Sequence, residues 1–186
     1  MSKDRHDDNH HHHHDNAGLH DSAASKDSSN DHPGESGDDG PNDLHGNEGD
    51  DNLNGHGGDD RLDGGPGDDH LTGGKGHDLL HGGPGHDRFD FNSLDDSLPD
   101  DSHDVIGDFH HGDKIDLRHI DAEDGPGNQR FHWIGDNGFH NQAGELHFVH
   151  RGHGVVLQGD TDGDGNADFE VVLHHINGLH RHDIIV

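Results

Sequence analysis

The chain has 186 residues, of which 23% are hydrophobic, and a formal net charge of −30 with histidine neutral. Such a chain is expected to stay unfolded unless something neutralises its charge. The acidic balance, with only 11 Lys and Arg, argues against a nucleic-acid partner. The absence of Cys excludes disulfides and thiolate metal sites, and no apolar run is long enough for a membrane span.

Residues 1–36 are rich in His, Asp, Ser and Asn and are predicted to form a disordered tail. They lack the apolar segment of an N-terminal signal peptide. An unbroken tract, His10, His11, His12, His13 and His14, offers imidazole ligands suited to zinc, nickel or copper. A purification tag is the alternative interpretation of this tract, although it does not account for the high histidine content of the rest of the chain.

Residues 37–90 consist of six consecutive nine-residue units with the template G-x-x-G-x-D-x-L-x. The units read GDDGPNDLH, GNEGDDNLN, GHGGDDRLD, GGPGDDHLT, GGKGHDLLH and GGPGHDRFD. Glycine-rich disorder would not keep six apolar residues in phase, and a nonapeptide of this kind is typical of a calcium-binding parallel β-helix. The apolar residue at position 8 predicts one inward side chain per unit and therefore a thin stacked core.

The glycine and acidic positions of the units predict metal-binding turns. Positions 1 and 4 are always Gly, which tolerates positive φ and close backbone approach, so both are expected in tight turns with inward carbonyls. Position 6 adds a side-chain oxygen of the kind calcium prefers. The predicted calcium-binding residues are Asn42, Asp51, Asp60, Asp69, Asp78 and Asp87 at position 6, with Gly40, Gly49, Gly58, Gly67, Gly76 and Gly85 at position 4.

Residues 91–186 regain aromatic and branched residues in short runs that predict strands. The runs lie at 105–109, 114–117, 131–134, 145–149, 155–157 and 169–173. No segment has a sustained 3.6-residue period, so little helix is expected. Because a repeat array needs a cap at its exposed end, this region is predicted to form a C-terminal β-sandwich that continues the roll.

Two acidic loops in this region are further candidates for calcium. Asp160, Asp162 and Asp164, with Asp168 in the ninth position, follow the first half of an EF-hand loop, but Val171 stands where a bidentate Glu is expected. A solvated hairpin turn is the alternative. Asp108 and Asp113 could bind calcium at the junction of roll and cap, and the alternative there is a solubilising loop.

The repeats resemble the RTX family of haemolysin-type calcium-binding repeats. Residues 89–186 resemble the C-terminal domain of serralysin-type metalloproteases through the stretches FDFNSLDDSLPDDSHDVIGDFHHGDKIDLRHIDA, GDTDGDGNADFEVVL and HDIIV. The resemblance implies a β-roll in which two units make one turn and calcium lies between units i and i+2. The implied pairs are Asn42 with Asp60, Asp51 with Asp69, Asp60 with Asp78, and Asp69 with Asp87, the first being the weakest.

The resemblance also implies a non-catalytic domain of a bacterial protein that type I secretion machinery exports without an N-terminal signal peptide. The export signal would be the terminal segment Asp183, Ile184, Ile185 and Val186, an acidic residue followed by three apolar ones. The expected domains are a disordered tail at 1–36, the RTX roll at 37–90 and the cap and secretion domain at 91–186.

These observations favour a secreted calcium-binding protein that folds on calcium after export and binds a transition metal through histidine. No enzyme activity is expected, because the H-E-x-x-H motif does not occur. One alternative is the secretion module of a split or truncated serralysin with a separate protease partner. Another is a pH-responsive matrix or surface protein, since protonation of all 27 histidines would change the charge from −30 to −3.

Overall fold

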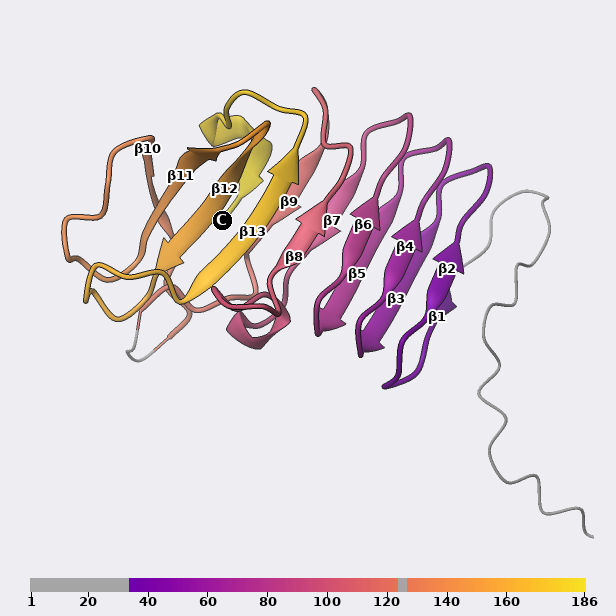
Figure 1. Cartoon of the computed structure of the whole chain (residues 1–186), viewed down its shortest axis with the longest axis horizontal. Helices are drawn as coiled ribbons and strands as arrows, with labels where there is room; N and C mark the ends of the chain where they lie inside the picture. The colour runs from indigo at the N-terminus through magenta and orange to yellow at the C-terminus, as the bar shows by residue number, and fades with distance from the viewer. Residues whose placement is uncertain (1–33, 124–126) are drawn as a thin grey trace, which may run out of the picture.

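The computed structural model describes residues 34–123 and 127–186, which form short β-strands and two 3-10 turns without an α-helix (Figure 1). The all-β prediction is therefore confirmed. Within the described residues, no helix is long and apolar enough to cross a membrane. The histidine tract His10–His14 lies outside the described residues.

The strands form two sheets, A and B. Sheet A contains, in spatial order, β1 (Glu35–Ser36), β3 (Asn52–Gly57), β5 (His70–Lys75), β7 (Arg88–Asp90), β9 (Lys114–Asp116) and β14 (Ile184–Ile185). Sheet B contains β10 (His132–Gly135), β11 (Glu145–Arg151), β12 (Gly154–Asp160), β13 (Phe169–His174), β8 (Asp104–Ile106), β6 (Leu79–His81), β4 (Arg61–Asp63) and β2 (Asp43–His45). The 3-10 turns are η1 (Leu94–Asp96) and η2 (Arg181–Asp183).

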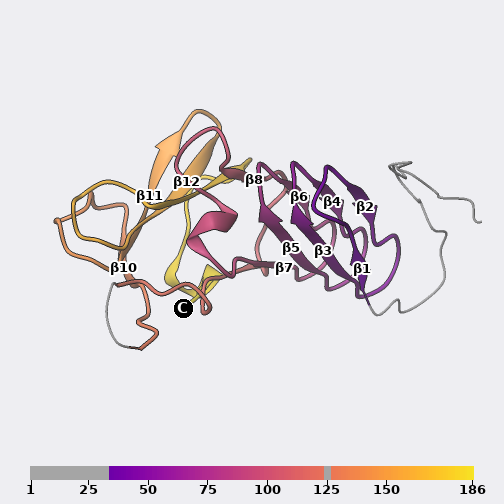
Figure 2. The same ribbon diagram turned by 90° about the horizontal axis from the view of Figure 1, so that it is seen from below.

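Successive repeat units contribute strands alternately to the two sheets, which form the two layers of the roll seen in Figure 2. Parallel neighbours are therefore two units apart, as in the pairing of Leu53 with Leu71 and of Leu62 with Leu80. The position-8 side chains point between the layers, and Leu53, Leu62, Leu71, Leu80 and Phe89 are completely buried. The predicted β-roll, in which two units make one turn, is thus confirmed.

Both sheets continue beyond the six recognisable repeats. In sheet B, β8 pairs with β6 and places Ile106 beside Leu80, while in sheet A β9 pairs with β7 and places Ile115 beside Phe89. Residues 99–107 and 108–116 therefore act as a seventh and an eighth unit. They lie out of phase with the first six because residues 91–98, which include η1, are inserted before them.

The C-terminal region continues both sheets of the roll. Strands β11, β12 and β13 form an antiparallel meander whose last strand pairs in parallel with β8, and β14 pairs in parallel with β9. Phe169 joins the common core, where its ring meets Phe91 edge-on at a centroid distance of 5.3 Å. Each of the six predicted runs overlaps a strand, with boundaries displaced by up to a few residues.

Candidate metal-binding site

Stacked turns along each edge of the roll are connected by a ladder of position-6 side chains. The backbone N–H of a position-6 residue donates a hydrogen bond to the carboxylate Oδ1 of the position-6 residue two units later, at N–O distances of 2.7–3.1 Å. One ladder runs through Asn42, Asp60, Asp78 and Asp104, and the other through Asp51, Asp69, Asp87 and Asp113. The four predicted pairs are therefore neighbours, and each ladder gains one further pair.

At five positions of these ladders, the second carboxylate oxygen is buried without a hydrogen bond. This holds for the Oδ2 atoms of Asp60, Asp69, Asp78, Asp87 and Asp104. A buried carboxylate oxygen without a partner is costly unless a proton or a cation satisfies it. The recurrence of the same oxygen in successive turns indicates a function shared by the turns.

The electrostatics of the ladders agree with this geometry. Burial raises the pKa of the Asp69 and Asp78 carboxyls to about 7 and the pKa of Asp60 and Asp87 to about 6. Neighbouring carboxylates raise these pKa values further, whereas the backbone hydrogen bonds to Oδ1 lower them. Burial, with Asp78 beside it, also raises the pKa of Asp104. Without a cation, the folded ladders therefore hold protons on these carboxyls to a higher pH than the unfolded chain does.

At the position-1 glycines Gly55 and Gly64, a carbonyl oxygen lies near the free carboxylate oxygen of a ladder aspartate. A methyl group built on Gly64 would lie 2.3 Å from Asp69 Oδ2 and 2.8 Å from the carbonyl oxygen of Gly82. On Gly55 it would lie 2.2 Å from Asp60 Oδ2 and 2.6 Å from the carbonyl oxygen of Gly73. The two oxygens therefore lie close to the same point of the turn and form a cradle, and carboxylate and carbonyl oxygens are the ligand types that calcium prefers.

The two glycine positions differ in conformation: close backbone approach is found at both, but in the described residues positive φ is found only at position 4. Position-4 residues Gly49, Gly58, Gly67 and Gly76 do have positive φ, and a methyl on Gly67 would lie 1.8 Å from the carbonyl oxygen of Gly49 in the stacked turn. In the described chain, position-1 glycines are outside the left-handed region and instead leave room for the carboxylate. The carbonyls next to the carboxylates belong to position 1, where inward carbonyls were predicted, although the predicted calcium-binding residues included only the glycines of position 4.

The predicted residues at the junction of roll and cap separate into two roles. Asp113 belongs to a ladder, because its Oδ1 accepts the N–H of Asp87 at 3.1 Å. Asp108 instead uses its two carboxylate oxygens to accept the N–H groups of Gly82 and Gly83, at 3.0 and 2.9 Å. It takes the place of the position-1 glycine in the eighth unit and attaches that unit to the sixth.

The acidic loop between β12 and β13 brings Asp160, Asp162 and Asp164 together, with one ligand atom of each within 4.8 Å of the others. Asp160 is buried and accepts the N–H groups of Gly163 and Gly165. Asp168 is directed elsewhere and accepts hydrogen bonds from the N–H and hydroxyl of Thr161. The hydrogen bonds of the hairpin itself thus organise this loop.

The terminal segment is part of the folded sheet. Ile184 pairs with Ile115 in sheet A, and Ile184 and Val186 are buried in the common core. Asp183 is also buried, and its Oδ2 accepts the backbone N–H of His180 at 2.8 Å. The residues of the predicted export signal are therefore largely inaccessible in the folded chain.

Folding also produces two histidine-containing groups that sequence spacing did not reveal. In each group, one ligand atom per residue lies within 4.8 Å of the others. The groups are Asp87, His110 and Asp113, and His180, His182 and Asp183. The first joins residues from different turns, so only knowledge of the stacking register could have predicted it.

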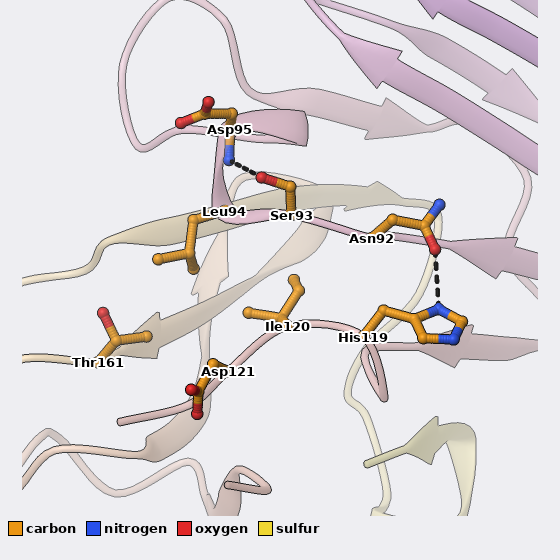
Figure 3. A pocket seen from close by; sticks show the side chains of 8 residues that line it. All are labelled: Asn92, Ser93, Leu94, Asp95, His119, Ile120, Asp121 and Thr161. Carbon is orange, nitrogen blue, oxygen red and sulfur yellow. Dashed lines mark hydrogen bonds between the residues drawn. The ribbon is translucent and has the colours of Figure 1, made fainter. Parts of the chain in front are cut away.

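A shallow pocket beside η1 is shown in Figure 3. Its histidine, His119, is hydrogen-bonded through Nδ1 to Asn92 Oδ1 at 2.8 Å, while the Ser93 hydroxyl accepts the N–H of Asp95 at the start of η1. Ser93 and His119 therefore form hydrogen bonds with other residues and not with each other. The pocket does not contain a serine–histidine pair of the kind that activates a nucleophile. The lining residues are Asn92, Ser93, Leu94, Asp95, His119, Ile120, Asp121 and Thr161.

Comparison with known proteins identifies both the repeats and the C-terminal region. The family described as peptidase M10 serralysin C terminal matches residues 63–186, and the RTX calcium-binding nonapeptide repeat matches residues 36–71. Among curated protein sequences, none matches the chain. Solution structures of two subunits of the Azotobacter vinelandii mannuronan C5-epimerase are similar. One is 31% identical, with a TM-score of 0.56, covering 82% of this chain and 90% of the other. The second is 29% identical, with a TM-score of 0.57 and 80% coverage of both chains.

Proposed function

Because this chain belongs to the peptidase M10 serralysin C-terminal family, we propose that it is a secreted protein that folds when its turns bind calcium outside the cell. The observation that carries the proposal is the row of buried carboxylate oxygens without hydrogen-bond partners at Asp60, Asp69, Asp78 and Asp104. Bound calcium supplies the positive charge that these oxygens lack. Metal binding and folding are then one process, because the cradles exist only where turns are stacked.

The proposed ligands are the Oδ2 atom of a ladder aspartate and the position-1 carbonyl oxygen two units later. Asp60 with Gly73 and Asp69 with Gly82 support this assignment most directly. Asp51 with Gly64 repeats the arrangement, and Asp78 with Asp104 extends its ladder by one pair. The turn of Asn42 would bind calcium more weakly, because an amide oxygen carries no full charge.

Calcium titration followed by far-UV circular dichroism tests this proposal. The full chain in a chelator at neutral pH should have a disordered spectrum and should gain β-structure as calcium is added. Isothermal titration calorimetry on the same sample should show calcium binding over the same concentration range as the spectral change. A chain that is already rich in β-structure in the chelator would contradict calcium-dependent folding.

In this proposal the type I secretion machinery recognises Asp183, Ile184, Ile185 and Val186 in the unfolded chain. Export from a bacterium with such a channel should be lost when residues 183–186 are deleted. Leu62→Ala is the matched control, because it removes a completely buried side chain from the roll but leaves the terminus intact. Equal export of the truncated and full chains would contradict this role of the terminus.

The tract His10–His14 is proposed to bind zinc, nickel or copper, and composition is its support. Deleting residues 1–36 should lower the number of zinc ions bound in calorimetry, and unchanged binding would remove this part of the proposal. We assign no catalytic step to the chain, because the matched families describe a C-terminal domain and calcium-binding repeats.

A further inference from the structure

The last turn of one ladder, residues 108–113, differs from the turns that precede it. Position 1 is Asp108 instead of Gly, and position 3 is His110. In the six regular units, position 3 is never histidine, being occupied by Asp39, Glu48, Gly57, Pro66, Lys75 and Pro84. A nitrogen donor thus enters the ladder at this turn.

His110 faces the two carboxylates of the last ladder pair. Its Nδ1 lies 3.0 Å from Asp113 Oδ1, and one ligand atom from each of Asp87, His110 and Asp113 lies within 4.8 Å of the others. Asp87 and Asp113 are each only 1% exposed, and Asp87 Oδ2 is buried without a hydrogen-bond partner. The imidazole is 42% exposed, so an ion could enter from that side and retain water ligands.

We propose that Asp87, His110 and Asp113 form a site for a divalent transition-metal ion, zinc fitting best, and not for calcium. Calcium is bound almost entirely by oxygen, whereas an imidazole with carboxylates suits zinc and its neighbours among the transition metals. Three protein ligands and one position left for water is a common zinc arrangement. The inference rests on the proposed folding, because stacking of the sixth and eighth units brings these residues together.

The site can be tested by nuclear magnetic resonance, which separates it from the histidines of the tail. Zinc is added to the calcium-saturated, 15N-labelled full chain. The backbone signals of residues 86–87 and 110–113 should shift, and these shifts should be lost in His110→Ala. The matched control is His111→Ala, which removes the adjacent exposed imidazole and should retain them.

Three results would overturn the assignment: no zinc-induced shift at residues 86–87 and 110–113, the same shift in His110→Ala, or reversal of the shift by additional calcium. Zinc shifts confined to residues 180–183, the other histidine group, would count as the first of these. A dispersed spectrum of His110→Ala in calcium would show that the variant is folded. Failure of the calcium-folding proposal is detected by a different measurement, a circular dichroism spectrum that does not change when calcium is added. The zinc titration by nuclear magnetic resonance then remains the test of the Asp87, His110 and Asp113 site.

Discussion

Replacing Asp69 by Asn should change stability in opposite directions with and without calcium. Asp69 is completely buried at the centre of one ladder, and its pKa is raised from 3.8 to about 7. Asparagine has nearly the same shape, and its side-chain oxygen can still accept the N–H of Asp51. The substitution therefore removes the negative charge while the ladder hydrogen bond is retained.

The sign follows from proton linkage. Because the pKa of Asp69 is higher in the folded apo chain than in the unfolded chain, the folded state binds more protons between those two values. Stability of the apo chain thus falls as pH rises from about 4 to about 7. A shift of about 3 units corresponds to roughly 4 kcal/mol, lost in full above about pH 7. This cost is a large part of the usual stability of a domain, about 5–15 kcal/mol.

Asp69→Asn should therefore stabilise the apo chain by up to about 4 kcal/mol at about pH 8, and hardly at all near pH 4. With calcium the variant lacks a charged ligand, and the calcium concentration at half-folding should rise, because the calcium-binding free energy lost at this site is expected to exceed the stability gained by the apo chain. Circular dichroism as a function of pH in a chelator, followed by calcium titration, measures both effects. Asp136→Asn, an exposed position with the same charge change, is the control.

The reasoning would be refuted if Asp69→Asn left the pH dependence of the apo chain unchanged. It would also fail if the variant and the wild type needed the same calcium concentration to fold. A general effect of reduced net charge is recognised by an equal response of Asp136→Asn, because both variants remove one negative charge from the chain.

Three further results are expected. Gly64→Ala should raise the calcium concentration needed for folding, because its methyl group would lie 2.3 Å from Asp69 Oδ2. Gly138→Ala is the control and should behave as wild type in the same titration, because its methyl group would have no atom within 4 Å. Ile184→Ala should lower the free energy of unfolding, measured by urea denaturation in calcium, by about 2–5 kcal/mol, because the Ile184 side chain is only 3% exposed. An unchanged free energy of unfolding would contradict the packing of β14 at the end of sheet A. Magnesium should not replace calcium in folding, because it requires a compact octahedral shell and retains water, and a β-rich spectrum in magnesium alone would contradict the oxygen cradles.

The regular part of the roll could be predicted from the sequence because one residue type repeats at one position. Leucine at position 8 defines both the period and the inward face, and the stacking of Leu53 on Leu71 follows from it. The seventh and eighth units could not be found in this way. Residues 91–98 interrupt the phase, and Asp108 replaces the glycine that marks the start of a unit.

The site was predictable in its acidic residues but not in its complete donor set. Asp60 and Asp69 follow from the repeat, whereas the choice of carbonyl depends on how adjacent turns stack, which places the oxygens of Gly73 and Gly82 beside them. His110 reaches Asp87 through the same stacking across the insertion. Such contacts depend on register between distant segments, which one-dimensional spacing does not contain.

The position of the terminal strand connects the ladders to the proposed export. Strand β14 has β9 as its partner in sheet A, and β9 begins directly after Asp113, whose carboxylate joins it to Asp87 in the ladder. When ladder carboxylates are ionised and no cation is bound, their repulsion and desolvation oppose the stacking that places β9. The terminal strand then has no edge to pair with, and Asp183 and Ile184 stay accessible. Where calcium is scarce, as in the cytosol, the proposed export signal is exposed, and calcium outside the cell would bury it by completing the sheet.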